Sequence, residues 1–314
     1  MKSNKWKFLL TGAATLTLLT ACTQASSQSA TKSNTAQTTA TSTSKNKTNN
    51  SNYFTDKDKD TSYDESKAST VKLSGSSASV SGDGVAVSGS TVTISKAGTY
   101  VISGESDGVQ IKVEAGDSDD VHIVLKGVTM TNTNAPISAT KAGHVYLTLA
   151  DGTTNTLSDS SSNNDEDADA VIFSKGDLTI NGSGTLNIDA KKNNGIKAND
   201  TLHITGGTYK ITAVGDAFNV NDELNITGTT MTIDADEDAV KVDNDEDTSV
   251  GTMYLSDNKM TITAGDDGIH ASGDLIIDSG TSSNLFHSDL VDLRLGLQDA
   301  RCQHSSPSVD QYPT

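Results

Sequence analysis

A short phrase recurs along the second half of the chain and limits the folds that the chain can adopt. Each copy begins with Asp or Asn, continues with a small and then an apolar residue, and a Leu follows eight positions after its start. A repeat this short cannot bury its apolar face alone, so successive copies must stack into a solenoid. The complete copies are Asn194-Gly-Ile-Lys-Ala-Asn-Asp-Thr-Leu202, Asp216-Ala-Phe-Asn-Val-Asn-Asp-Glu-Leu224 and Asp267-Gly-Ile-His-Ala-Ser-Gly-Asp-Leu275; Asp238 begins a fourth copy and Asp169 a looser fifth.

The apolar residues of the repeats form three columns. Side chains alternate between the two faces of a strand, so two residues of one parity point inward from each strand. The leading positions of the first column, 178, 202, 224, 253 and 275, are spaced by 24, 22, 29 and 22 residues, and the longest step contains an insertion at 244–251. The pattern predicts an all-β fold, a parallel β-helix with three short strands and about 22 residues per coil. The columns run from Leu178/Ile180 to Leu275/Ile277, from Leu186/Ile188 to Met260/Ile262, and from Ile196/Ala198 to Ile269/Ala271.

The composition narrows the class of partner. The formal net charge is −18 and only 4% of the residues are aromatic. Nucleic acid is not an expected partner, because phosphate neutralisation needs clustered Lys and Arg. An acidic polymer would be repelled as well unless a cation lies between the two surfaces.

The N-terminus has the pattern of an export signal. Lys2, Lys5 and Lys7 precede an apolar run at 8–19 that is too short to span a bilayer. The run ends in Leu19-Thr20-Ala21-Cys22, which is similar to a bacterial lipobox. We therefore expect residues 1–22 to be a lipoprotein signal peptide, with Cys22 lipidated and the protein held on the extracellular face of the cell membrane by this anchor only. The alternative is an ordinary signal peptide with an incidental Cys.

Three further segments follow. Residues 23–65 are almost all Ser, Thr, Asn, Gln, Lys and Ala, a composition that favours a disordered tether. Residues 66–283 contain the alternating apolar pattern and form the expected β-helix domain. Residues 284–314 break the pattern, and both arginines of the chain, Arg294 and Arg301, lie there. We interpret this tail as a frameshift or truncation that leaves an open sheet edge; the alternative is a capping helix over 289–298.

The Asp or Asn that begins each repeat is the best candidate for chemistry. Stacked coils place these side chains in one column at a corner of the solenoid, and neighbouring carboxylates repel each other. A hard divalent cation such as calcium (Ca2+) relieves that repulsion and takes oxygen ligands in flexible geometry. The alternative is that the residues only shape turns through backbone hydrogen bonds. The candidate metal ligands are Asp169, Asn194, Asp216, Asp238 and Asp267, with Asp266 beside them.

The position three residues after the corner points outward and is Lys197, Asn219, Lys241 or His270. Such a face, next to bound cations, could hold sugar hydroxyls or uronate carboxylates; a solvated strand face is the alternative. Outward aromatic side chains that could stack on a sugar are not evident. The histidines at 122, 144 and 203 show no metal-ligand spacing.

Catalytic motifs are scarce. The chain has no Gly-x-Ser-x-Gly elbow and no zinc-binding His motif. A polysaccharide lyase would need a strong base, and the repeats contain no Arg. Lys197 or Lys241 could act as the base only if its pKa were lowered.

Residues 70–283 resemble the secreted bacterial carbohydrate-binding β-helix family once catalogued as a domain of unknown function. The resemblance implies a right-handed parallel β-helix like that of pectate lyases, bound Ca2+ and non-catalytic binding of cellulose- or pectin-like polysaccharide. It implies a metal role for the Asp members of the column. We expect a monomer; a Ca2+-dependent lyase and a surface adhesin or cell-wall structural protein are the alternatives. The resembling segments are Gly98-Thr-Tyr-Val-Ile-Ser-Gly104, Val121-His-Ile-Val-Leu-Lys-Gly-Val-Thr-Met130, Val145-Tyr-Leu-Thr-Leu-Ala-Asp-Gly-Thr-Thr-Asn-Thr-Leu157 and the repeats.

Overall fold

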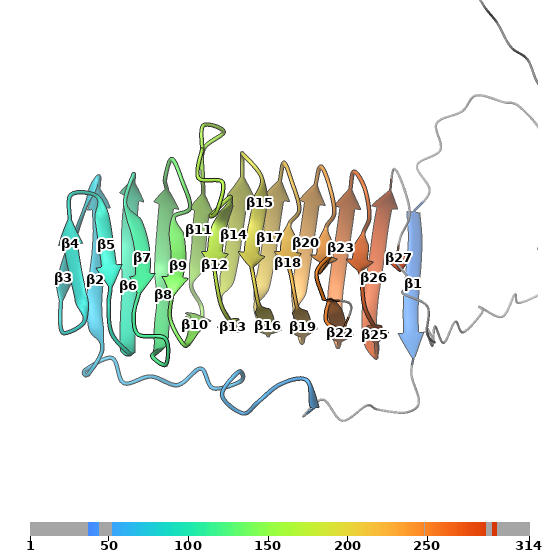
Figure 1. Cartoon of the computed structure of the whole chain (residues 1–314), viewed down its shortest axis with the longest axis horizontal. Coiled ribbons are helices and arrows are strands. Elements are labelled where there is room, and N and C mark those ends of the chain that lie inside the picture. The colour runs from blue at the N-terminus through green and yellow to red at the C-terminus, as the bar shows by residue number, and fades with distance from the viewer. Residues whose placement is uncertain (1–36, 44–51, 248, 287–290, 294–314) are drawn as a thin grey trace, which may run out of the picture. The chain divides into compact units, whose positions relative to one another are not determined.

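The computed structural model describes residues 37–43, 52–247, 249–286 and 291–293. Within these ranges the chain forms strands and turns and no α-helix, so none of its described segments is a helix that could cross a membrane. The strands stack coil upon coil along one axis (Figure 1). The expected signal peptide and its Cys22 lie outside the described residues.

Each complete coil contributes three strands, which form three rows of parallel strands that we call the first, second and third sheets, although two long strands join the first two rows into one hydrogen-bonded sheet. The first sheet contains β10 (His144–Leu149), β13 (Leu178–Gly182), β16 (Thr201–Thr205), β19 (Glu223–Thr227), β22 (Thr252–Ser256) and β25 (Leu275–Ile277). The second contains β11 (Thr154–Ser158), β14 (Thr185–Ala190), β17 (Thr208–Ala213), β20 (Thr230–Ala235), β23 (Asn258–Ala264) and β26 (Ser279–Phe286). The third contains β5 (Thr91–Ile94), β7 (Gln110–Glu114), β9 (Ile137–Lys141), β12 (Ala170–Ser174), β15 (Asn194–Ala198), β18 (Phe218–Val220), β21 (Val240–Val242), β24 (Ile269–Ala271) and β27 (Val291–Leu293). Two long strands, β6 (Gly98–Asp107) and β8 (Asp120–Thr131), extend through both the first and second sheets.

The interior is filled by ladders of like residues. Leu178 lies beside Leu202, which lies beside Leu224, and the series continues through Met253 to Leu275. The first four of these side chains are buried, and burying an aliphatic side chain stabilises the fold by about 1.5–3 kcal/mol. These pairings confirm the parallel β-helix and the inward columns expected from the sequence, except at the last coil, where Ile277 is 44% exposed.

Antiparallel strands lie at both ends of the solenoid. At the N-terminal end, β2 (Ser69–Gly75) joins β6, and β3 (Ser77–Ser81) pairs antiparallel with the other edge of β2. In the third sheet, β4 (Val85–Ser88) covers β5 in the same way. At the C-terminal end, β1 (Gln37–Thr43) pairs antiparallel with β26. These strands satisfy backbone groups that open edges would otherwise present.

The open sheet edge expected at the break is wrong for β26, which pairs on both sides, while the interpretation of residues 284–314 as a frameshift or truncation stays a prediction. Strand β26 continues through residue 284 in parallel register with β23, and β27 pairs with β24. The alternative capping helix over 289–298 is also wrong at 291–293, where the backbone is extended. The physical reason is that a sheet edge pairs with backbone groups, which are the same whatever side chains follow. Residues 294–314 lie outside the described ranges.

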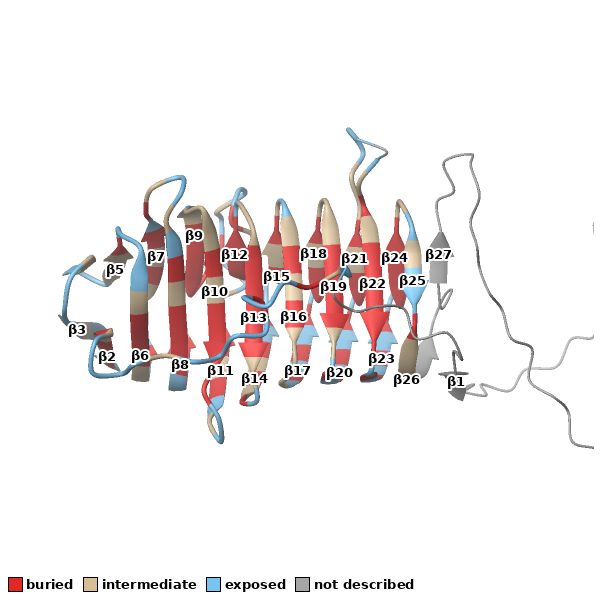
Figure 2. Ribbon diagram, turned by 90° about the horizontal axis from the view of Figure 1, so that it is seen from below, coloured by how far each residue is buried: buried red, intermediate tan, exposed pale blue. Residues whose placement is uncertain are grey.

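The prediction of a disordered tether is wrong for its last part. Residues 53–65, here called the strap, run along the outer face of the first sheet toward β2 (Figure 2). Phe54 is 4% exposed and Asp58 is 2% exposed. Composition suggested disorder because the strap has few apolar residues, but the sheet beneath it offers polar partners for its backbone and carboxylates.

Candidate metal centre and the strap-covered sheet face

The repeated Asp or Asn lies where the chain enters the third sheet, and one of its oxygens builds a ladder between coils. The backbone N–H of Asp216 donates to Oδ1 of Asn194 at 3.2 Å, and that of Asp238 donates to Oδ1 of Asp216 at 2.9 Å. The N–H of Asp267 donates to Oδ1 of Asp238 at 2.8 Å. An acceptor is needed at each step, which explains why Asp and Asn interchange here. The column therefore has a structural role in addition to any role in binding.

The small residue that follows the corner is explained by the same close stacking. A Cβ on Gly195 would lie 2.6 Å from the carbonyl oxygen of Ala217 and 2.9 Å from Cγ2 of Ile211. Ala217 and Ala239 occupy the equivalent positions of the next coils and are fully buried. Larger side chains at this corner would separate the coils and break the ladder.

Two of the outward side chains that we expected to contact a ligand, Lys197 and Asn219, bond to the column. Lys197 Nζ lies 2.7 Å from Oδ1 of Asp169. Asn219 donates from Nδ2 to Oδ2 of Asp216 at 2.6 Å. These side chains neutralise or satisfy the second oxygens that a metal would otherwise use, and both are partly exposed.

Lys241 contributes a charge between two coils. Its Nζ lies 3.7 Å from Oδ2 of Asp216 and 3.3 Å from Oδ2 of Asp238. Burial raises the pKa of Asp216. Burial acts to lower the pKa of Lys241, but attraction to Asp216 and Asp238 outweighs it and the pKa is raised. Lys241 therefore stays protonated at neutral pH and supplies the positive charge at this level of the column.

The C-terminal end of the column has a different arrangement. Asp238, Asp266 and Asp267 each offer a carboxylate oxygen, and these oxygens lie within 4.8 Å of one another. His270 is 3% exposed, with Nδ1 3.4 Å from Oδ2 of Asp267 and Nε2 4.0 Å from Oδ2 of Asp243. Carboxylate oxygens converging from two coils, one of them exposed, are the donor set that Ca2+ prefers.

The structure thus brings together three of the six metal ligands predicted from the sequence. Asp238, Asp266 and Asp267 converge, and their carboxylates fit a hard cation. The other three candidates, Asp169, Asn194 and Asp216, lie further along the ladder and are engaged by Lys and amide groups. At this end of the column Lys241 lies 3.3 Å from Oδ2 of Asp238, so that carboxylate is shared between the lysine and the cluster.

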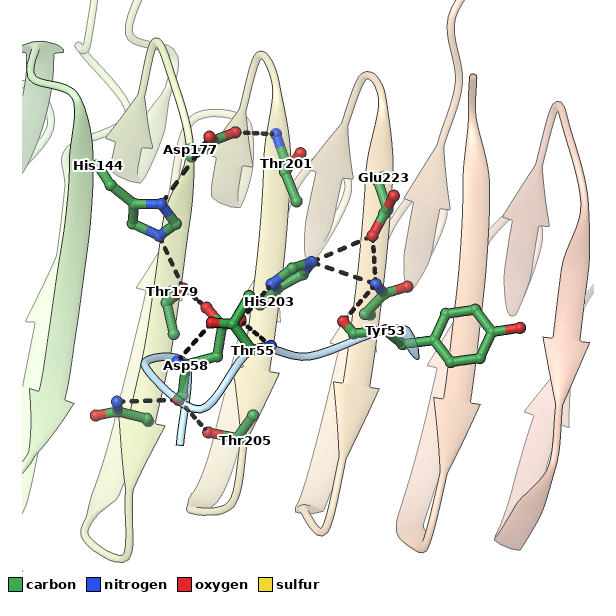
Figure 3. A network of polar contacts seen from close by, with 12 residues as sticks. Tyr53, Thr55, Asp58, His144, Asp177, Thr179, Thr201, His203, Thr205 and Glu223 are labelled. Carbon is green, nitrogen blue, oxygen red and sulfur yellow. Dashed lines mark hydrogen bonds and ion pairs between the residues drawn. The ribbon is translucent and has the colours of Figure 1, made fainter. Parts of the chain in front are cut away.

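A second polar site, which the sequence did not reveal, lies beneath the strap (Figure 3). The Asp58 carboxylate accepts from Thr179 Oγ1 at 2.6 Å and lies 3.2 Å from Nδ1 of His203. The backbone carbonyl of Asp58 accepts from Thr205 Oγ1 at 2.8 Å and from Asn181 Nδ2 at 3.1 Å. All four partners project from the outer face of β13 or β16.

Aromatic side chains flank this polar centre. The Tyr53 ring stacks on Tyr254 of β22 with centroids 3.7 Å apart and planes 5° apart, and the Tyr53 carbonyl accepts from Asn225 Nδ2 at 3.0 Å. At the other side, Lys57 Nζ lies 4.5 Å from the ring centroid of Tyr146 on β10. The expectation that no outward aromatic side chain would be found is therefore corrected. The signal in the sequence was the pair Tyr53 and Phe54 within an otherwise polar stretch.

Comparisons with known proteins place this geometry in context. A family model described as "Carbohydrate-binding domain-containing protein" matches residues 88–288. A protein of Acetivibrio thermocellus with the same description is 36% identical over 126 residues, which is 38% of this chain and 44% of the relative. The aligned part thus spans less than half of that relative.

A solved structure is also similar. It is described as a polysaccharide lyase-like protein from C. thermocellum, in a gadolinium derivative. It shares 29% sequence identity with this chain at a TM-score of 0.63, and the match covers 73% of this chain and 98% of the solved one. The parallel β-helix therefore extends over nearly the whole of that structure.

Proposed function

The chain belongs to the carbohydrate-binding domain-containing protein family, and from this premise we propose that its β-helix is a non-catalytic, Ca2+-dependent module that binds a cellulose- or pectin-like polysaccharide. The observation that carries the proposal is the convergence of Asp238, Asp266 and Asp267 on the outer corner of the solenoid. Ca2+ held there would supply positive charge for uronate carboxylates and ligand positions for sugar hydroxyls. The acidic protein needs such a bridge to approach an acidic polymer.

The solved relative is described as a gadolinium derivative. Gadolinium is a trivalent ion that prefers oxygen ligands, as Ca2+ does. In this chain the residues that would hold the cation are Asp238, Asp266 and Asp267. Asp169 and Asp216 are expected to remain structural, because Lys197 and Lys241 lie against their carboxylates. Lys241 also lies 3.3 Å from Oδ2 of Asp238, so the cation would share that carboxylate with the lysine.

A polysaccharide lyase is the second candidate, favoured by the lyase-like description of the solved relative. A lyase base must lose its proton near neutral pH, and the raised pKa of Lys241 makes that residue unsuited to the role. We therefore rank binding above cleavage. We also propose that the protein is a monomer, attached through Cys22 to the extracellular face of the membrane, which would hold the β-helix at the cell surface.

Binding to polygalacturonate at millimolar Ca2+, with and without excess chelator, tests the proposal. We expect the chelator to weaken binding at least about tenfold, equivalent to about 1.4 kcal/mol, and to lower the melting temperature. The double variant Asp266→Asn/Asp267→Asn should lose the same affinity, because its amides cannot replace the charge of two carboxylates. Glu105→Gln, an exposed change on β6, is the matched control and should bind as the wild type does.

Three outcomes would contradict the proposal. Retention that is unchanged by the chelator would remove the metal from the mechanism. Growth of the ultraviolet absorbance of unsaturated uronates during incubation would establish a lyase. A glycan array that stays blank at millimolar Ca2+ would favour an adhesin or structural protein.

A further inference from the structure

The outer face of the first sheet presents hydrogen-bond donors in register. Tyr146, Thr179, His203, Asn225 and Tyr254 occupy equivalent positions on five consecutive strands. Neighbouring members are separated by the strand spacing of about 4.8 Å. A straight row of donors bounded by two aromatic rings suits an extended chain that carries acceptors at regular intervals.

The strap contacts this row and the neighbouring Asn181 and Thr205 mostly through acceptors, and the exception is Lys57, whose ammonium lies over the ring of Tyr146. Its carboxylate at Asp58 and its carbonyl oxygens at Tyr53, Asp58 and Asp60 receive the hydrogen bonds, while Thr, Asn and His side chains of the sheet donate them. The ring of Tyr53 lies flat on Tyr254. These contacts reproduce what an acidic sugar chain offers: a carboxylate, oxygen acceptors and a flat ring face.

We propose that the strap-covered face is a binding site for an acidic glycan and that the strap occupies it as an intramolecular stand-in, which a polyuronate chain displaces. The inference rests on the proposed function in that it assumes a glycan ligand, but its site is separate from the carboxylates at the corner. The uronate carboxylate would take the place of Asp58 between Thr179 and His203. Sugar hydroxyls would take the places of the strap carbonyls.

Release of the strap exposes polar groups together with a limited apolar surface, namely the ring of Tyr254 beneath Tyr53 and the cluster of Val101, Val124 and Ala150 against which Tyr63 packs. Among its side chains, Phe54 is the buried hydrophobic one, and it packs edge-on to His203 at a centroid distance of 5.5 Å. Donors freed on the sheet can bond to water or to the ligand, so the hydrogen bonds of the strap are exchanged rather than simply lost. A cavity of about 220 Å³ between strap and sheet, lined in part by Lys57, His122 and Tyr146, offers a first place for a sugar ring.

Limited trypsin digestion of the full-length protein tests displacement directly. The strap contains two exposed trypsin sites, Lys57 and Lys59. Saturating polygalacturonate should raise the rate of cleavage at both by at least about threefold, whereas methyl-esterified polygalacturonate, which lacks the carboxylates, should not. A free peptide substrate in the same mixtures corrects for effects on trypsin itself. Unchanged cleavage, or protection of both lysines, would overturn the proposal.

A set of variants tests the competition. Asp58→Asn weakens the strap and should raise the affinity for polygalacturonate about threefold or more. Asp56→Asn, an exposed change two positions away, is the matched control. Adding Thr205→Val to Asp58→Asn removes one donor with little change of shape and should cancel the gain. Equal affinity of wild type and Asp58→Asn would overturn the proposal, provided that their circular dichroism spectra agree.

The two proposals fail in different ways. If wild type binds polygalacturonate and loses it with chelator, but Asp58→Asn has no effect, only the strap inference is wrong. If the gain in Asp58→Asn persists in Asp266→Asn/Asp267→Asn, the strap-covered site is supported independently of the metal. If neither protein binds any glycan, both proposals are wrong.

Discussion

Asp58 and His203 are charged groups that stay charged where little water reaches them. Burial acts to raise the pKa of Asp58, but hydrogen bonds from His203, Thr179 and Thr55 outweigh it, and the pKa lies well below its ordinary value. Burial acts to lower the pKa of His203, but its contacts with Asp58 and Glu223 raise the pKa to about 9. Each of the two groups is charged because the opposite charge lies beside it. The contact between the strap and the sheet at this point therefore depends on both charges.

This pair predicts how the strap responds to pH. The pKa of His203 is about 9 in the folded protein and about 6.5 in an unfolded chain, so its stabilisation is complete below about pH 6 and is lost as pH rises through about 9. The pKa of the Asp58 carboxyl is lowered in the folded protein, so its contribution to the free energy of unfolding is lost only when the pH falls into the strongly acidic range. We expect the free energy of unfolding to fall by on the order of 2 kcal/mol between pH 6 and pH 10.

Urea denaturation followed by circular dichroism measures the effect. His203→Gln cannot titrate, so its free energy of unfolding should show a clearly smaller fall over the same interval. Parallel curves for wild type and variant would mean that His203 does not gain its charge from Asp58.

The roles of some residues could be predicted from this sequence, and the roles of others could not. The corner residues Asp216 and Asp238 could be found because the repeat period aligns them. Their neighbours could not be assigned, because period alone does not say whether Lys241 reaches toward solvent or back to a carboxylate. Asp58 carried no signal at all, since its partner His203 is 145 positions later in the chain.

At the level of strands, each coil contacts mainly the coils before and after it. Ile204 of β16 lies directly beside Ile226 of β19, and both are fully buried. Ile123 of β8 lies in the same column, separated from Ile204 by β10 and β13. A stacked solenoid gains stability from neighbouring pairs, so mutations should couple at short range only.

A double-mutant cycle tests this expectation. Ile204→Ala and Ile226→Ala should each cost about 2–5 kcal/mol, and their combination should depart from additivity by at least about 0.5 kcal/mol because the two cavities merge. The losses of unfolding free energy caused by Ile204→Ala and Ile123→Ala should be additive to within about 0.5 kcal/mol in the double variant. Chemical denaturation measures the free energy of unfolding of the wild type, the three single variants and the two double variants; equal coupling in both cycles would contradict a nearest-neighbour core.

The strands of the repeats could be predicted from the sequence because their apolar residues alternate and recur in register. The strap could not, because an extended segment that binds through its carbonyl groups leaves no side-chain period. Strands β26 and β27 were missed for a related reason: sheet pairing uses backbone atoms, and residues such as Ser282 and Ser283 carry no inward apolar signature.

The whole solenoid must also avoid joining end to end with another copy. Stacked parallel strands leave an open edge at each end, and such edges pair with other chains. β3 and β4 protect the N-terminal end, and β1 protects β26 at the other. A segment that precedes the domain in sequence thus covers one edge strand, β26, at the C-terminal end.

Proline in β1 tests whether this cover keeps the protein monomeric. Alternate residues of an antiparallel strand direct their N–H groups to the partner, so replacing two consecutive residues must remove at least one bond. Thr39→Pro/Ala40→Pro should therefore free the edge of β26 and shift the protein toward dimers and larger species in light scattering. Thr39→Ser/Ala40→Ser retains the backbone donors and should remain monomeric. Because the net charge of −18 opposes association, the shift should grow with salt concentration; a proline variant that stays monomeric at high salt would show that β1 is not needed as a cover.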